Sequence, residues 1–196
     1  MTRRPAAAKN LIVLALAAGC AFAGSAGAAV PKDQYRSERD RVQAAYKTAL
    51  DSCTALKANA RDICRAEAKG NYQVAKAELE AQYRPTPKRD DKVKREKAEA
   101  AYRLAKEKCD DLSGNAKDVC SKEAKATYVA ARGEEKVSRA AVEKGVNSRK
   151  ANSERKEARD DNTDAQYAAA KERCDALSGD AKANCIGDVK KKFGKM

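Results

Sequence analysis

The chain has 196 residues, of which 42 are Lys or Arg and 29 are Asp or Glu, so its formal net charge is +13. It contains no His, which excludes catalytic triads that use His, zinc sites with His ligands and the usual haem attachment. Beyond the first thirty positions, Leu, Ile, Val and Phe together supply only about one position in nine. This is too few for a conventional core, and it is typical of disorder or of long helices rich in Ala, Glu, Lys and Arg.

The first 28 residues have the pattern of a secretory signal peptide. Three basic residues precede an apolar stretch of about a dozen residues, and Ala26-Gly27-Ala28 is a suitable cleavage site. The stretch is shorter than the ~20 apolar residues that a membrane span needs. We therefore predict an exported, periplasmic protein that loses this segment, after which 39 basic and 29 acidic residues leave a charge of +10.

A second reading of the leader concerns Leu16-Ala17-Ala18-Gly19-Cys20, which resembles a bacterial lipoprotein cleavage box. If the box is used, Cys20 would be acylated and the protein anchored to a membrane. Otherwise the mature chain keeps six cysteines, which form disulfides in an oxidising compartment. No two of them have the Cys-x-x-Cys spacing of a thioredoxin-type redox site.

Three segments repeat one pattern: Tyr, six residues, Cys, two residues, Leu, three residues, Ala, three residues, Cys, seven residues and an aromatic residue. The pattern begins at Tyr46, at Tyr102 and again at Tyr167. Such a match indicates internal duplication. The cysteines of the three repeats are Cys53 and Cys64, Cys109 and Cys120, and Cys174 and Cys185.

The centre of each repeat predicts a short turn between two helices. Gly114 and Gly179 are suited to a left-handed turn residue, and Asn115 is a candidate N-cap, whereas the first turn lacks a Gly. In an antiparallel hairpin, facing residues have position numbers with a nearly constant sum. This rule pairs the two cysteines of each repeat, and it pairs Tyr35 with Tyr83, Tyr46 with Tyr72, Tyr102 with Tyr128, and Tyr167 with Phe193.

We therefore predict an all-α, elongated protein made of three consecutive antiparallel helical hairpins, each stapled by its own disulfide. The seam is coiled-coil-like, with Tyr102, Ala105, Cys109 and Leu112 on one face of the helix. Each disulfide would contribute roughly 3 kcal/mol by restricting the unfolded chain. The predicted order is a signal peptide (1–28), hairpin 1 (32–84), a Pro-containing linker (85–91), hairpin 2 (92–133), a polar, partly helical linker (134–161) that breaks at 145–148, and a truncated hairpin 3 (162–196).

The leader, the Ala/Lys/Glu helices and the cysteine pairs resemble a loose group of uncharacterised periplasmic proteins of Gram-negative bacteria, labelled TolA-like or cell-envelope biogenesis proteins. The most recognisable pieces are LSGNAKDVC, which ends at Cys120, and EAKA at 123–126. The resemblance covers nearly the whole mature chain. It implies a helical protein that serves the cell envelope.

The sequence offers no catalytic, cofactor-binding or metal-ligating set and no evident small-molecule substrate. We expect a non-catalytic protein with a structural or protein-interaction role in the envelope and an unknown partner. The alternative is a binder of polyanions such as an anionic membrane surface, lipopolysaccharide or nucleic acid, with contacts at Lys190, Lys191, Lys192 and Lys195, near which only Asp188 is acidic. A basic holdase chaperone is a third reading, but the seam leaves no broad apolar patch for it.

Overall fold

The computed structural model describes residues 29–195, and most of them are helical. The six helices are α1 (Lys32–Cys53), α2 (Ala58–Tyr83), α3 (Pro87–Cys109), α4 (Gly114–Lys144), α5 (Arg149–Cys174) and α6 (Gly179–Lys192). The described residues form no strand, so the predicted all-helical class is confirmed. The predicted signal peptide and the candidate acylation site Cys20 lie outside the described residues.

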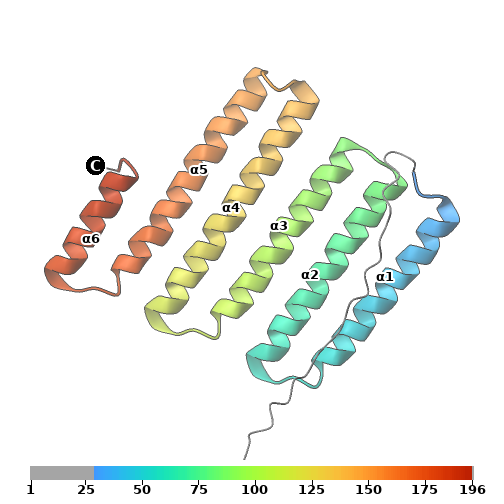
Figure 1. Ribbon diagram of the computed structural model, residues 1–196, viewed down its shortest axis with the longest axis horizontal. Coiled ribbons are helices and arrows are strands. Elements are labelled where there is room, and N and C mark those ends of the chain that lie inside the picture. The colour runs from blue at the N-terminus through green and yellow to red at the C-terminus, as the bar shows by residue number, and fades with distance from the viewer. Residues whose placement is uncertain (1–28, 196) are drawn as a thin grey trace, which may run out of the picture.

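The helices lie side by side in chain order and form a layer one helix thick (Figure 1). Successive helices run in opposite directions, and each packs only against the helices next to it in sequence. Disulfides join α1 to α2, α3 to α4, and α5 to α6. Both broad faces of the layer are therefore left without a covering element of the described chain.

Local sequence determines where α3 and α5, the first helices of hairpins 2 and 3, begin. The Thr86 hydroxyl accepts a hydrogen bond from the Arg89 amide at 3.3 Å, and Pro87 occupies the first turn of α3, where a missing N–H has no cost. Ser148 caps α5 in the same way, by accepting from the Ala151 amide at 3.1 Å. The predicted break at 145–148 is present, with Gly145 at φ +92° after the end of α4.

The hairpin turns use the glycines as predicted but not the expected cap. Gly114 and Gly179 have φ values of +54° and +53°, and Ala58 takes the same left-handed conformation at +47°. Asn115 is not the N-cap, because α4 begins one residue earlier, at Gly114, and the cap position is Ser113. Its side chain is free to bond elsewhere.

The buried positions are mostly small. Alanine and the first cysteine of each repeat dominate them: Cys53, Ala68, Ala77, Leu79, Ala98, Cys109, Ala126, Ala140, Ala151, Ala169 and Cys174. Leu112, predicted to lie in the seam, is 43% exposed, and the equivalent Leu56 and Leu177 are 40% and 44% exposed. The prediction for Leu112 was wrong because the helix ends at the cysteine, which places the leucine in the turn beyond the last facing pair.

The two predicted linkers are largely helix. Of the segment 85–91 only residues 85 and 86 precede α3, because a proline is tolerated at a helix start. Of the segment 134–161 only residues 145–148 are not helical, so hairpins 2 and 3 are both longer than predicted. Ala140 of α4 and Ala151 of α5 are buried there. The alanines in this polar stretch therefore pack helix against helix instead of spacing the hairpins apart.

Candidate functional site

The disulfides are the first of the predicted site features. Cys53–Cys64, Cys109–Cys120 and Cys174–Cys185 are all present, with Cα atoms 5.6, 5.6 and 5.7 Å apart. These separations lie within the usual range for a disulfide. The first cysteine of each pair is buried, and the second is half-buried. Their position at the turn of every hairpin makes them structural cross-links.

The predicted aromatic pairs are also present along the same seams. Tyr46 and Tyr72 stack with ring centroids 4.5 Å apart, and the outer pair Tyr35 and Tyr83 stacks at 4.3 Å. The other two hairpins hold Tyr102 against Tyr128 at 4.8 Å, stacked, and Tyr167 against Phe193 at 6.0 Å, edge to face. Such pairs contribute about 0.5–1.5 kcal/mol beyond their buried area.

An ion pair joins the two sides of the turn in two of the three hairpins. Lys117 contacts Asp110 at 2.8 Å in hairpin 2, and Lys182 contacts Asp175 at 2.8 Å at the equivalent position of hairpin 3. The hydrogen bond to Asp110 raises the pKa of Lys117, and the hydrogen bond from Lys182 lowers the pKa of Asp175. Both groups therefore stay charged at neutral pH.

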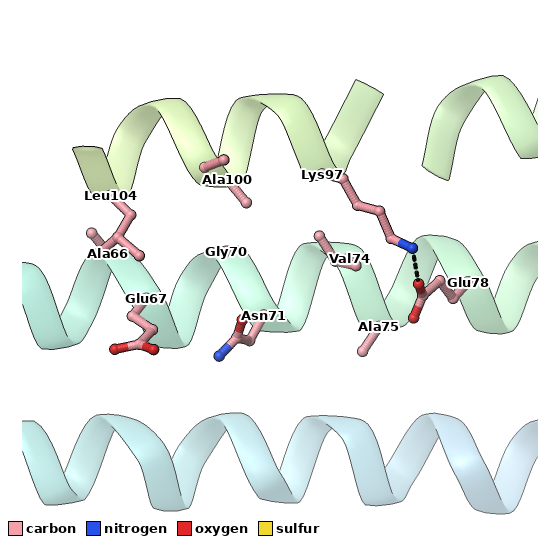
Figure 2. Close-up of a pocket in the computed structure, with 11 residues that line it drawn as sticks. Ala66, Glu67, Gly70, Asn71, Val74, Ala75, Glu78, Lys97, Ala100 and Leu104 are labelled. Carbon is pink, nitrogen blue, oxygen red and sulfur yellow. Dashed lines mark ion pairs between the residues drawn. The ribbon is translucent and has the colours of Figure 1, made fainter. Parts of the chain in front are cut away.

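A groove of about 480 Å³ runs between α2 and α3, at the junction of the first two hairpins (Figure 2). At its base Gly70 lets the helices approach so closely that a Cβ there would be 2.9 Å from the Cβ of Ala100. Lys97 and Glu78 form an ion pair of 2.7 Å across the groove (Figure 2). Sequence reasoning missed this junction, although a Gly in mid-helix is a recognised sign of close approach.

The α4–α5 junction repeats this arrangement. Its groove of about 560 Å³ is lined by residues equivalent to those of the first, such as Glu123 and Ala126, and Arg173 of α5 pairs with Glu123. Near the far end of the junction a Cβ at Gly133 would be 2.8 Å from that of Ala158. Each groove contains four alanines and is crossed by one ion pair between its two helices.

An amide links each hairpin to the next at both junctions. The Asn59 side chain donates to the backbone carbonyl of Glu107 at 2.8 Å, and Asn115 donates to the carbonyl of Glu172 at 2.8 Å. These carbonyls lie in the last turn of α3 and α5, where each also accepts the backbone N–H of the residue that follows its helix, Asp110 or Asp175, and the Asn amide is the second donor to each. Asn115 therefore serves the junction between hairpins and not its own helix.

A third hollow, of about 610 Å³, lies toward the other end of α3 and α4 and contains a buried carboxylate. Glu135 is 1% exposed, and Arg132 and Arg139 contact it at 2.9 and 3.4 Å. Asp91 is buried nearby and lies 3.9 Å from Lys94. A buried charge with such partners is compensated, so the hollow is best interpreted as a structural ion cluster.

The predicted polyanion contacts do not form one site. Lys191 pairs with Asp188 at 3.7 Å, and Lys195 pairs with Asp164 of α5, which raises the pKa of Lys195. Lys192 lines the α4–α5 groove, whereas Lys190 lies on another side of α6. The expectation that Asp188 is the only acidic neighbour was wrong, because Asp164 is far away in sequence and adjacent in the fold.

Two further classes of site are absent from residues 29–195. No three Cys, Asp or Glu side chains gather there as a metal ion would require. None of the six described helices is both long and apolar enough to cross a membrane.

These features define a class of protein: a row of helical hairpins, each closed by one disulfide and joined to the next by close helix packing. Comparison with known proteins adds no narrower assignment, since no family model, curated protein or solved structure matches this chain.

Proposed function

We infer that the chain is a non-catalytic, exported helical repeat protein that acts as a platform for a protein partner in the bacterial cell envelope. The observation that carries this is the single layer, in which each described helix packs only against its chain neighbours. Such a layer presents two broad faces with open grooves between its described helices, which suits contact with a large partner better than binding of a small substrate.

Three sequence features support the envelope role. Residues 1–28 have the pattern of a signal peptide, the hairpins carry cysteine pairs suited to an oxidising compartment, and the chain resembles the TolA-like periplasmic group. The heptad-like seams with Tyr pairs make the hairpins comparable to short coiled coils. Disulfides stabilise a layer whose buried residues are mostly Ala, and they keep each hairpin closed while its faces contact a partner.

The test is a pull-down from periplasmic extract with the oxidised mature chain, run at low and at high salt. We expect one protein to be recovered at both salt concentrations, because a specific interface depends little on screened charge. The control is a variant with all six cysteines replaced by Ser, which should lose the partner if the rigid layer is required. Recovery of only a salt-sensitive mixture contradicts the platform role. Mass spectrometry of the exported chain tests removal of the leader after Ala28.

A further inference from the structure

Lysine recurs at equivalent positions of the hairpins. Lys69, Lys125 and Lys190 each follow the second cysteine of their repeat at the same distance, and Lys106 and Lys171 each precede the first cysteine at the same distance. All five side chains are exposed. Among the described residues none of the five forms an ion pair with a carboxylate, in contrast to Lys97, Lys117, Lys182 and Lys195. We call these five residues the lysine row.

The lysine row lies on the face of the layer opposite the two grooves. An α-helix turns by about 100° per residue, so residues nine apart point in opposite directions. Lys69 is nine residues from Glu78, and Lys106 is nine residues from Lys97. Glu78 and Lys97 form the ion pair across the first groove (Figure 2). Lys171 is likewise nine residues from Asn162, which lines the second groove.

In hairpin 2 two members of the row converge on one aromatic pair. The Lys106 amino group lies 6.0 Å from the centroid of the Tyr102 ring. The Lys125 amino group lies 5.9 Å from the same centroid and 5.3 Å from that of Tyr128. The rings hold the two cations near each other by cation–π attraction. An anion between these cations would relieve their mutual repulsion.

All five lysines occupy similar heights on their helices. Lys106 and Lys171 precede the disulfide cysteine of their helix by three residues, and the other three follow theirs by five. At about 1.5 Å per residue, each lysine lies within about 8 Å of the disulfide level. With helices about 8–10 Å apart, a row from α2 to α6 is about 35 Å long. The row therefore crosses the helices as a line.

We propose that the lysine row binds a linear phosphodiester polyanion, a single strand of nucleic acid, laid across the helices. A line of cations matches a chain of phosphates. A flat anionic membrane would in addition contact two acidic residues, Asp160 and Asp164, which lie eleven and seven residues before Lys171 and so on the same side of α5. Of these, Asp164 pairs with Lys195, and Asp160 does not form an ion pair with any described residue. A strand that follows the row avoids these two carboxylates. The acidic residues one turn after Lys106 and Lys171 are Asp110 and Asp175, and their charges are already paired with Lys117 and Lys182. This ligand site is separate from the platform role, so either can fail without the other.

The test compares two charge-matched variants of the oxidised mature chain. The row variant carries Lys69→Gln, Lys106→Gln, Lys125→Gln, Lys171→Gln and Lys190→Gln. The control variant removes five cations from the opposite face: Lys94→Gln, Lys97→Gln, Lys108→Gln, Arg159→Gln and Lys192→Gln. The probe is a fluorescent oligothymidine of roughly 20 nucleotides, longer than a typical single-strand binding site. Binding is measured by anisotropy between roughly 50 and 200 mM salt, and circular dichroism verifies that both variants are folded.

Five phosphate contacts predict a log–log salt slope of about −3.5, which is an affinity loss of about 100-fold over that range. We expect the wild type and the control variant to show this slope and the row variant to lose most of it. The proposal is overturned if the two variants bind alike, if the wild type does not bind the strand, or if it binds anionic phospholipid vesicles more tightly than the strand. A failed strand assay beside a successful pull-down leaves the platform role standing.

Discussion

Replacing Gly70 by Ala tests the packing that joins the first two hairpins. On an open helix surface this change stabilises by about 0.8–1.0 kcal/mol, because Ala has the higher helix propensity. At Gly70 the added Cβ would lie 2.9 Å from the Cβ of Ala100 and 3.5 Å from its Cα. Neither atom belongs to a flexible side chain, so the helices must move apart, at an overpacking cost of about 1–3 kcal/mol. We expect a net loss of about 0–2 kcal/mol.

Gly187 supplies the matched control. It lies within α6, and a Cβ there would meet no atom within 4 Å. Gly187→Ala should therefore show the full gain of about 1 kcal/mol. In the Gly70→Ala background, Ala100→Gly removes the Cβ that the new side chain would overlap and should restore the close approach of the two helices. The double-mutant cycle should therefore give a coupling free energy of at least ~1 kcal/mol between the two positions.

The assay is urea unfolding of the oxidised protein followed by circular dichroism, with stability compared only where the slope m is unchanged. The reasoning is refuted if Gly70→Ala stabilises as much as Gly187→Ala. In that case α2 and α3 do not pack, and the hairpins are independent modules separated by a short linker. Gly133→Ala, facing Ala158, repeats the test at the second junction.

Three further outcomes follow from the turns, the last staple and a buried carboxylate. Ala58→Gly should stabilise the protein by about 0.5–1 kcal/mol, because Ala58 has φ +47°, a conformation that glycine adopts without strain. Gly114→Ala should destabilise it for the same reason. If urea unfolding shows the same change in stability for both variants, the turn at Ala58 is not strained. Replacing Cys174 and Cys185 by Ser should unfold α6 alone and so remove about a tenth of the helical circular dichroism signal, since α6 has 14 residues and none is buried. A larger loss would mean that hairpin 3 stabilises the other hairpins. A lysine one turn earlier lowers the pKa of Glu154, so its stabilisation is present above about pH 4.3 and is lost as the pH falls further. Glu154→Gln should reduce the fall of the urea unfolding midpoint at acidic pH. If the midpoint falls as much as in the wild type, the ion pair of Glu154 with this lysine does not contribute to stability.

The hairpins could be predicted because their determinants are local. Cys109 and Cys120 are only 11 positions apart and bracket a Gly, so the fold-back and its disulfide follow from spacing. The same fold-back places Tyr102 against Tyr128, and the observed stacking agrees with it. Periodicity over a few turns carries this information without knowledge of the rest of the chain.

The junctions between hairpins could not be predicted, because they depend on contacts distant in sequence. Asn59 and Glu107 are 48 residues apart, and neither forms part of the Cys and Tyr pattern. Pro87 and the polar residues after Gly133 favoured linkers on composition alone. In the fold Pro87 begins α3, and small residues such as Ala151 become the buried contact between helices. Polar composition and close packing are compatible when the packed residues are Ala and Gly.

The outer side of α6 differs from those of α2 and α4 at the two positions that hold a following hairpin. Asn59 and Asn115 donate an amide N–H to the next hairpin, but the equivalent Asp180 has a carboxylate, which cannot donate and would repel a carbonyl. In α6 the position equivalent to Gly70 and Ala126 is Lys191, whose long side chain would prevent another helix from packing closely. Repeat layers need a polar outer repeat to prevent open-ended stacking. These two residues therefore disfavour head-to-tail packing of another hairpin, such as that of a second copy, against α6.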